Sequence, residues 1–412
     1  MSIEYVFNTK IKNPSQGVSL GILDSGEAEK ARRYHQGFTE YQPSPLVQLS
    51  KLADYLGLGK LFIKDESSRF GLNAFKVLGA SYAIGRYLAE RLGRDISEIS
   101  YEELRSEEIR SQLGDITFTT ATDGNHGRAV AWAAAQLHQK AVIYMPKGSD
   151  PVRLKNIRAH GAEASITDLN YDDAVRLSQQ KAKENGWVII QDTAWSGYED
   201  IPTWIMQGYA TLAVEAMEQM KEQGVTAPTH VFLQAGVGSF AGGVLGFLAS
   251  SLGDSMPKIT IVEPEKADCL YHSAKIGDGK PHTVDGDLDT LMAGLACGEP
   301  NSIGWELLRD YAAAFVSCPD SLAATGMRVL ATPLKGDDTI ISGESGAVTT
   351  GLLHLLMESE SGNAARLREL LELDKNSVVL LVSTEGNTSP RAFRDAVWYG
   401  EYSDREVNRN RK

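Results

Sequence analysis

The chain has 412 residues, a length for which roughly two or three domains of about 150 residues each are typical. Apolar residues make up 42% of it and charged residues 23%, values that argue against disorder and against a fibrous repeat. The formal net charge of -13 would repel a polyphosphate backbone, so no nucleic-acid partner is expected. We therefore expect a folded, water-soluble protein in which any anionic ligand requires a local site.

The three cysteines, Cys269, Cys297 and Cys318, have neither the CxxC nor the Cys/His spacing of a zinc site. We expect no metal centre and no disulfide framework, and spacing alone does not show whether Cys269 and Cys297 pair. So few cysteines suit a reducing compartment, and the N-terminus has no continuous apolar stretch of secretory length. These features predict a cytoplasmic protein.

Residues 231–253 demand a membrane test, because this stretch carries no charge and is long enough to span a bilayer. Its glycines and the interior Gln234 and Ser239 favour another interpretation. A buried strand, a glycine turn and a buried helix would give the same chargeless run. We therefore expect no membrane association.

From residue 60 onward, short apolar runs alternate with longer stretches of helical spacing, which is the pattern of a parallel sheet with crossover helices. The predicted strands are residues 61–63, 116–119, 141–145, 164–167, 188–191, 230–234, 258–262 and 377–382. The predicted helices are residues 75–91, 126–139, 150–160, 171–185, 204–223 and 242–252. The alternation predicts an α/β fold.

A charge-rich stretch, residues 92–114, interrupts this alternation and is typical of a solvated amphipathic insertion. After it, the strand and helix units between residues 116 and 190 are short enough to form a compact subdomain of their own. We therefore predict a large domain of residues 1–90 and 191–412, and a small inserted α/β domain of residues 91–190.

A glycine-rich loop follows the predicted strand 230–234 and leads into an apolar helix. Its residues are Gly236, Val237, Gly238, Ser239 and Phe240. Glycines let backbone amides approach an anion, and a helix N-terminus adds unpaired amides, so the loop could hold a phosphate. A dinucleotide fingerprint would have its third glycine at Ala241 and would come earlier in the chain. Plain strand-to-helix packing is the remaining alternative.

Lys76 stands alone in an apolar frame at the start of a predicted helix, beside Phe75, Val77 and Leu78. One interpretation is a surface lysine whose stem covers apolar neighbours. The other is a desolvated lysine with a lowered pKa, whose amine attacks an aldehyde and then carries a proton. Together with a phosphate site, such a lysine suggests pyridoxal 5'-phosphate.

Four motifs occur in a fixed order: Lys76, TATDGNHG at residues 120–127, the glycine loop, and STEGN at residues 383–387. In this order they resemble the tryptophan-synthase-β-like, or fold type II, pyridoxal phosphate enzymes, over roughly residues 41–399. The resemblance implies a three-layer parallel-sheet fold with a smaller inserted α/β subdomain, and a homodimer. Within the family, the stretches ATDGNHGRAVAWAA, QDTAWSGYEDIPTWIMQGY and STEGNTSP are similar to those of ammonia-lyases that act on 2,3-diaminopropionate.

The resemblance also implies which residues hold the cofactor. Lys76 would form the Schiff base, Asn125 would bind the phenolic oxygen, and Thr384 would face the pyridine nitrogen, with Ser383 as the alternative if the register is shifted by one. The remaining cofactor residues would be Phe75, Glu344 and the loop Gly236, Val237, Gly238, Ser239 and Phe240. The alternative for Glu344, in SGESG, is an ordinary loop glutamate.

Asp123 departs from the commonest family pattern, which has a serine or a small residue at this place. In related racemases a serine there is the base on the face opposite the lysine, so the resemblance implies that Asp123 removes the Cα proton of the D isomer and Lys76 that of the L isomer. Asp123 or Asp192 would bind the substrate's β-ammonium, since a carboxylate gives a strong charge-assisted hydrogen bond. Asp192 could instead cap a turn. Tyr171 and Thr120 are further substrate-binding candidates, and His126 is more simply structural.

The expected function is α,β-elimination of D- and L-2,3-diaminopropionate to pyruvate and two ammonia. A serine or threonine dehydratase of the same fold is an alternative among enzymes. A catalytically idle sensor that binds the cofactor or an amino acid is the alternative from another class, and a dinucleotide oxidoreductase is a third.

Overall fold

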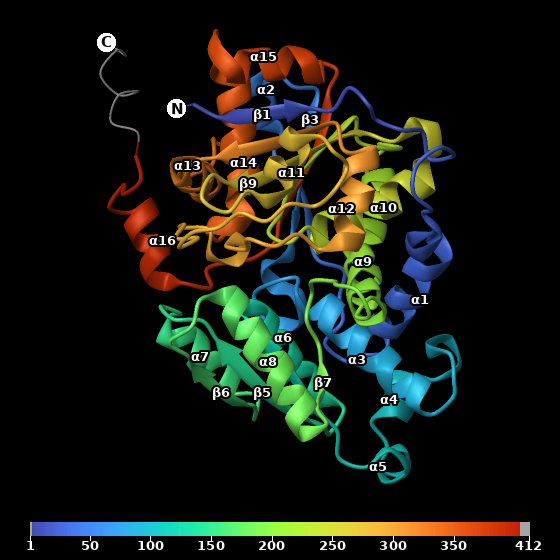
Figure 1. Ribbon diagram of the computed structural model, residues 1–412. Coiled ribbons are helices and arrows are strands. Elements are labelled where there is room, and N and C mark those ends of the chain that lie inside the picture. The colour runs from blue at the N-terminus through green and yellow to red at the C-terminus, as the bar shows by residue number, and fades with distance from the viewer. Residues whose placement is uncertain (1, 123, 404–412) are drawn as a thin grey trace.

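The computed structural model describes residues 2–122 and 124–403, so the predicted base Asp123 lies outside the described residues. The chain forms two α/β units, each built around its own sheet (Figure 1). The unit with the larger sheet is the upper one in the view, and the smaller unit, drawn in green, lies below it.

The larger sheet has seven strands in the order β1-β10-β9-β8-β11-β3-β2. In chain order they are β1 (Glu4–Phe7), β2 (Leu46–Gln48), β3 (Lys60–Asp65), β8 (His230–Gln234), β9 (Lys258–Pro264), β10 (Ala314–Cys318) and β11 (Val378–Ser383). The five central strands are parallel, whereas the edge strands β1 and β2 pair antiparallel with their neighbours. The sheet is therefore parallel at its centre, as predicted, with two antiparallel edges that were not predicted.

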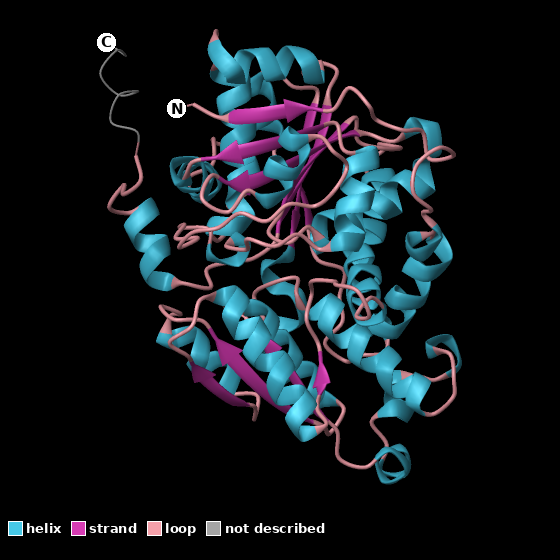
Figure 2. Ribbon diagram, viewed as in Figure 1, coloured by secondary structure: helices cyan, strands magenta, loops and turns pink. Residues whose placement is uncertain are grey.

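Two apolar cores lie on opposite faces of this sheet. Along β11, Leu380 and Val382 belong to the core that contains much of α3 (Val77–Arg91), α9 (Asp200–Glu222) and α10 (Ser239–Leu252). Val379 and Leu381 belong to the other core, with α13 (Asp320–Ala331) and α14 (Glu344–Glu358). Because successive side chains of a strand point to opposite faces, this alternation gives helix, sheet and helix in three layers (Figure 2).

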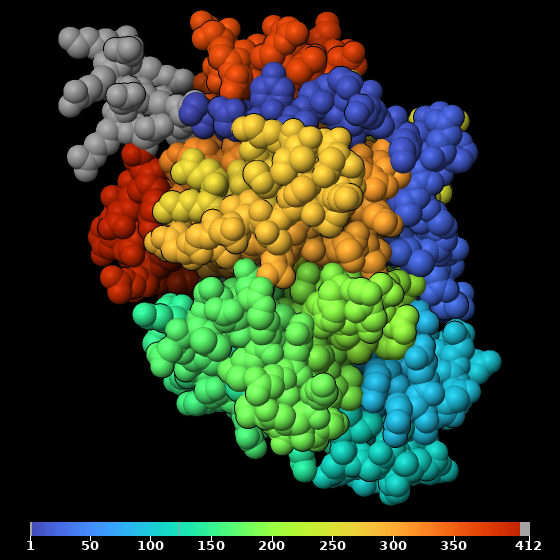
Figure 3. Space-filling view, in the orientation of Figure 1, coloured from blue at the N-terminus to red at the C-terminus, as the bar shows by residue number. Residues whose placement is uncertain are grey.

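The smaller unit is an all-parallel sheet in the order β6-β5-β4-β7. Its elements are β4 (Thr117–Ala121), α6 (Asn125–Gln136), β5 (Lys140–Met145), α7 (Pro151–Arg158), β6 (Glu163–Ile166), α8 (Tyr171–Asn185) and β7 (Val188–Ile189). In the space-filling view it lies directly against the large unit (Figure 3). The domain boundaries at residues 90 and 190 stay a prediction.

Local sequence explains several element ends. Helix α8 occupies the predicted residues 171–185: the Asn170 side chain accepts from the Asp173 amide at 2.8 Å, and Gly186 ends the helix in the left-handed conformation. The chargeless stretch 231–253 divides into β8, the glycine loop and α10, as expected. In the described part of the chain no helix is long and apolar enough to cross a membrane.

The charged insertion contains the short helices α4 (Tyr101–Leu104) and α5 (Glu107–Leu113). Helices α13 and α14 were not predicted from the sequence, and neither were six others. They are α1 (Ser25–Gln36), α2 (Ser50–Leu56), α11 (Cys269–Ile276), α12 (Ser302–Tyr311), α15 (Gly362–Leu371) and α16 (Pro390–Val397).

Candidate active site

A cavity lies where the carboxyl ends of β8 and β11 meet the start of α3, and residues of both units line it. This is the edge at which parallel α/β sheets bind ligands. The predicted site residues on its wall are Phe75, Lys76, Asn125, Tyr171, Asp192, Gly236, Val237, Gly238, Ser239, Phe240 and Thr384. Side chains that are spread over more than 300 positions of the chain thus face one space.

Lys76 forms an ion pair with Asp192, with 2.6 Å between Nζ and Oδ2. Burial alone lowers the pKa of Lys76, but the Asp192 carboxylate more than offsets this and raises the pKa above its ordinary value. Burial likewise favours a raised pKa for Asp192, yet the Lys76 ammonium lowers it to about 2. The lowered pKa that one of the two interpretations assigned to Lys76 is therefore wrong, because that interpretation considered desolvation without the carboxylate from a distant segment.

The segment that carries Lys76 is fixed to the end of β11. The Phe75 amide donates to the Thr384 carbonyl at 3.0 Å, and Ala74 forms an antiparallel bridge with Glu385. Two residues after Lys76, the Leu78 carbonyl accepts from Nε2 of the buried His35 at 2.9 Å. The position of Lys76 is thus determined from both sides.

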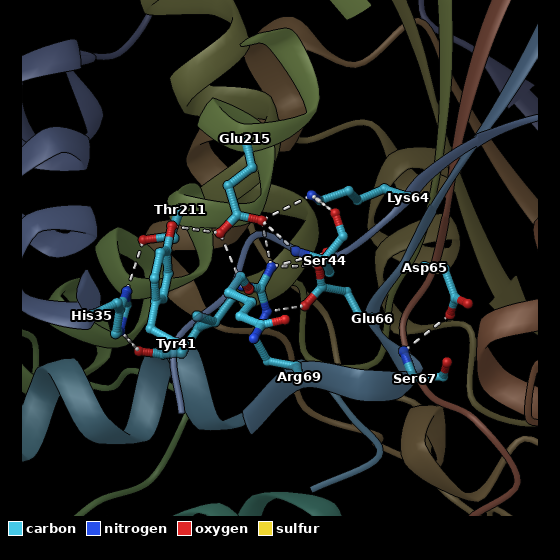
Figure 4. A network of polar contacts seen from close by, with 12 residues as sticks. His35, Tyr41, Ser44, Lys64, Asp65, Glu66, Ser67, Arg69, Thr211 and Glu215 are labelled. Atoms are coloured by element: carbon cyan, nitrogen blue, oxygen red, sulfur yellow. Dashed lines mark hydrogen bonds and ion pairs between the residues drawn. The ribbon is translucent and has the colours of Figure 1, made fainter. Parts of the chain in front are cut away.

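A buried network of charges anchors the chain just before this segment (Figure 4). Lys64 and Arg69 both donate to Glu215 of α9, at 2.8 and 2.6 Å, and Arg69 also pairs with Glu66 at 2.8 Å. These four side chains are at most 1% exposed, so each charge depends on its partners rather than on water. The network ties β3 and the following turn to α9.

The glycine loop has the shape of an anion cradle. Gly238 has φ +97°, in the left-handed region, and α10 begins at the next residue with its unpaired amides. A Cβ at Gly236 would lie only 3.2 Å from Cys297 Sγ. The Ser239 hydroxyl donates to the Asp192 carbonyl, which links the loop to the ion pair. A phosphate fits this loop, where backbone amides replace basic side chains.

Thr384, rather than Ser383, faces the cavity. Its Oγ1 accepts from Gln234 Nε2 at 2.8 Å, so its own proton is available to a ligand acceptor. Gln234 Oε1 is buried and has no hydrogen-bond partner among the described residues. Ser383 instead donates to Ser342 at 2.9 Å, away from the lining. The Thr384 hydroxyl can therefore donate a hydrogen bond to a ring nitrogen of a ligand in the cavity.

Several predicted residues lie outside the lining. Thr120 donates to Gln191 Oε1 at 2.7 Å, and Gln191 in turn donates to the Tyr171 hydroxyl at 2.9 Å. Glu344 is buried in an ion pair with Arg153 at 2.9 Å. Thr120 therefore supports the site through Gln191 and Tyr171, whereas Glu344 pairs with an arginine that also lies outside the lining.

The structure also brings residues to the cavity that were not predicted: Thr122, Gln234, Ala235, Ser345, Glu385 and the segment 293–297. Gln234 and Glu385 had a signal, since both stand at or just beyond the end of a buried strand of the same parallel sheet. The segment 293–297 had none, because it lies in a long connection without a motif. His126 lines the cavity too, and its Nε2 donates to the Ile190 carbonyl at 2.7 Å, which suits a structural role.

All three cysteines are buried free thiols, so Cys269 and Cys297 are not bonded to each other in this structure. Among the described residues, no cluster of histidine, cysteine and carboxylate side chains could hold a metal ion.

Lys76, the glycine loop and the Thr384 hydroxyl together define a class of protein. The chain belongs to the family of pyridoxal-phosphate dependent enzymes, whose model matches residues 38–385. The expected fold type II architecture and pyridoxal phosphate as the cofactor are thereby confirmed, and the relatives described next confirm the lyase class.

Individual relatives agree over nearly the whole chain. The diaminopropionate ammonia-lyase of Salmonella typhimurium is 54% identical over 97% of this chain and 98% of its own. The crystal structure of the holo, selenomethionine-containing diaminopropionate ammonia lyase from Escherichia coli superimposes with a TM-score of 0.90, at 50% identity and 98% coverage of both chains. The same Escherichia coli enzyme in complex with an aminoacrylate-PLP azomethine reaction intermediate gives a TM-score of 0.88, also at 50% identity and 98% coverage of both chains.

Proposed function

We propose that this protein catalyses α,β-elimination of 2,3-diaminopropionate, which with one water yields pyruvate and two ammonia. The single observation that carries the proposal is the Lys76–Asp192 ion pair, in which a buried carboxylate holds a partly buried amine in a cavity beside an anion cradle. The 54% identity to a diaminopropionate ammonia-lyase supports this choice of substrate.

The cofactor would be held by residues that line the cavity. Backbone amides of the glycine loop would bind its phosphate, joined by the Ser239 hydroxyl once it turns from the Asp192 carbonyl. Asn125 would bind its phenolic oxygen and Thr384 its ring nitrogen, with Phe75 packed beside it. When bound, pyridoxal phosphate supplies the electron sink that stabilises negative charge at the substrate Cα. A neutral hydroxyl partner such as Thr384 leaves the ring nitrogen less positive than a carboxylate would, which suits elimination.

Lys76 would act as the base for the L isomer. Its neutral Nζ takes the Cα proton, and the resulting ammonium is stabilised by the Asp192 carboxylate, 2.6 Å away in this structure. A β-ammonium leaves as ammonia with the electron pair of the broken C–N bond and needs no added proton, whereas a neutral β-amino group would first take the proton from Nζ. The released enamine then hydrolyses in water to pyruvate and the second ammonia, so nothing is oxidised.

Asp123 would act as the base for the D isomer, because the two isomers present their Cα protons on opposite faces. This role rests on the sequence, and the neighbouring Thr122 and Asn125 line the cavity. Asp192 is the candidate that distinguishes a β-ammonium from a β-hydroxyl, since it brings a buried negative charge to the substrate. Tyr171 would form part of the substrate wall, supported by Gln191 and Thr120.

We further propose that the enzyme acts in the cytoplasm as a homodimer, with an amino acid as its small-molecule partner. The few cysteines, all free thiols, support the first point. The family resemblance supports the second.

Steady-state kinetics of the purified holoenzyme test the activity. Each enantiomer of 2,3-diaminopropionate is compared with serine and threonine, while pyruvate and ammonia are measured together. We expect the highest kcat/KM with diaminopropionate and two ammonia per pyruvate. Higher turnover of the hydroxy amino acids, with one ammonia per keto acid, would favour the dehydratase. A coloured protein that releases neither product would favour a sensor.

A further inference from the structure

Glu385 is a buried carboxylate on the cavity wall that the proposed mechanism does not use. It is 2% exposed and follows directly on the end of β11. Three neutral donors surround it: Asn125 Nδ2 at 2.5 Å and Thr388 Oγ1 at 3.2 Å donate to Oε2, and the Ser345 amide donates to Oε1 at 3.2 Å. The surroundings of Glu385 therefore suit a group that only accepts hydrogen bonds.

No lysine or arginine of the described chain forms an ion pair with Glu385. The other buried carboxylates near the cavity do have a cation, since Asp192 pairs with Lys76 and Glu344 with Arg153. A buried charge without a counter-charge is costly even when it is hydrogen-bonded. Such a group is expected to have a function that a neutral side chain could not perform.

That function follows from the chemistry of the Asn125 amide. Its two ends, Oδ1 and Nδ2, have similar shape, but an ionised carboxylate accepts hydrogen bonds and cannot donate. Only Nδ2 can therefore face Glu385, and one of the two conformations of the amide is excluded. The second N–H of the same nitrogen remains for another acceptor, and Asn125 lines the cavity.

Glu385 is itself held firmly on the large unit. The Ser345 amide belongs to the first turn of α14, where the helix dipole favours a negative charge. Glu385 also pairs through its backbone with Ala74, two residues before Lys76. Asn125, in contrast, is the first residue of α6 in the small unit. The contact thus aligns an amide of one unit with the lysine segment of the other.

We propose that Glu385 is a positioning residue, which orients the Asn125 carboxamide so that Nδ2 donates to the phenolic oxygen of pyridoxal phosphate. The inference rests on the role proposed above for Asn125. It adds a residue that touches neither the substrate nor the cofactor in this scheme, and it explains why an uncompensated carboxylate stands on this wall.

Replacing Glu385 by glutamine tests this role, because a carboxamide can donate to Asn125 Oδ1 and thereby permits the amide to turn. We expect Glu385→Gln to weaken pyridoxal phosphate binding about tenfold, since a charge-assisted hydrogen bond is lost. The visible absorbance of the bound cofactor should titrate at lower pH than in the wild type, because a nearby negative charge no longer favours a protonated cofactor. Wild-type affinity together with a wild-type titration would overturn the proposal.

Asp310→Asn is the matched control. Asp310 is also a buried carboxylate with three donors, namely Lys12, Arg309 and the Val18 amide, and it lies outside the cavity lining. This control should lose thermal stability while cofactor affinity and absorbance stay as in the wild type. An equal loss of affinity in both variants would mean that Glu385 has a merely structural role.

A double-mutant cycle shows whether Glu385 acts through Asn125. In an Asn125→Ala background, Glu385→Gln should change the dissociation constant of pyridoxal phosphate less than twofold, because the group that it orients is gone. Independent, multiplying effects of the two substitutions would overturn the proposal. If Glu385→Gln does not fold by circular dichroism, Glu385→Asp replaces it, since it keeps the charge but is too short for the 2.5 Å contact. Unchanged affinity in the aspartate variant would count equally against the proposal.

These measurements are independent of turnover. If the wild type binds pyridoxal phosphate but releases no ammonia from diaminopropionate, the proposed function fails and the result for Glu385 stands. If the wild type is active and Glu385→Gln binds the cofactor normally, the inference about Glu385 fails alone.

Discussion

At the scale of single residues, the contact between Lys76 and Asp192 determines where the site keeps a proton. The raised pKa of Lys76 and the lowered pKa of Asp192 have one cause, the 2.6 Å ion pair in a buried setting. A lysine that must alternate between a neutral base and an ammonium benefits from such a neighbour, since the carboxylate stabilises the protonated form as it arises.

Asp192→Asn should therefore affect the diamino substrate most. Without the carboxylate, a β-ammonium loses its charged partner, whereas a β-hydroxyl loses little. We expect KM for 2,3-diaminopropionate to rise about tenfold or more and KM for serine to change much less. Steady-state kinetics with both substrates measure this, and equal changes would assign Asp192 to holding Lys76 alone.

Asp123→Asn tests the two-base arrangement. Loss of a general base reduces the rate by about 10² to 10⁴, and only the D isomer would depend on this base. We expect kcat/KM for the D isomer to fall by about 10² or more while that for the L isomer changes at most a few-fold. Equal losses for both isomers would indicate substrate binding in place of proton removal.

At the scale of elements, the site depends on buried polar contacts between segments that are far apart in the chain. Glu215 of α9 receives Lys64 from β3 and Arg69 from the following turn, so it links one helix to the strand and turn that precede Lys76. His35 of α1 contributes a further link, because it contacts both Leu78 of α3 and Thr211 of α9.

Glu215→Gln should strongly destabilise the protein. The substitution leaves Lys64 and Arg69 buried with one carboxylate fewer, and breaking a buried ion pair typically lowers the free energy of unfolding by about 3–5 kcal/mol. Denaturant unfolding measures this change. Glu372→Gln is the control, since Glu372 pairs with Lys258 on the surface and its loss should leave stability nearly unchanged. Similar losses in the two variants would contradict the importance assigned to burial.

The buried His35 should make the free energy of unfolding depend on pH. Burial lowers the pKa of His35 to about 3, so the folded state resists a proton that the unfolded chain accepts near pH 6.5. Its contribution is therefore complete above the unfolded pKa and is lost as the pH falls below it. From about pH 7 to about pH 5.5 the free energy of unfolding should drop by about 1 kcal/mol from this residue. In His35→Gln that part of the pH dependence should be absent. If the free energy of unfolding falls between about pH 7 and about pH 5.5 as steeply as in the wild type, this role of His35 is refuted.

The same contacts show what the sequence could and could not predict. Strand β8, the glycine loop and α10 were predicted correctly, because few other structures accommodate a chargeless run with clustered glycines. Strand β10 (Ala314–Cys318) was missed although it is fully buried, since no glycine, proline or other turn residue separates this short apolar run from the helix before it. The antiparallel edges β1 and β2 were missed because pairing partners lie far away in the chain.

Site residues divide in a similar way. Lys76, the glycine loop and Asn125 stand in local motifs and could be named from the sequence. The effect of Asp192 on the pKa of Lys76 could not, because their distance along the chain gives no hint of a contact in space. Glu385 belongs to the STEGN motif, yet its contact with Asn125 could not be predicted, because it depends on how the two units pack together.

At the scale of the whole molecule, the cavity belongs to neither unit alone. The large unit provides Lys76, Asp192, the glycine loop and Thr384, and the small unit provides Asn125, His126 and Tyr171. In the proposed scheme the covalent and phosphate contacts would lie on the large unit, and the contact with the phenolic oxygen and part of the substrate wall on the small one. The proposed chemistry would nevertheless start from, and return to, a cofactor joined to one lysine, Lys76.

Reductive trapping tests that requirement most directly. The purified holoenzyme is treated with borohydride, digested and mapped by mass spectrometry, with Lys76→Ala as the variant and exposed Lys375→Ala as its control. We predict that the pyridoxyl label is found on the peptide that contains Lys76 in the wild type and in Lys375→Ala, and that Lys76→Ala has neither label nor lyase activity. A label on another lysine of the wild type, or a labelled and active Lys76→Ala variant, would contradict this account.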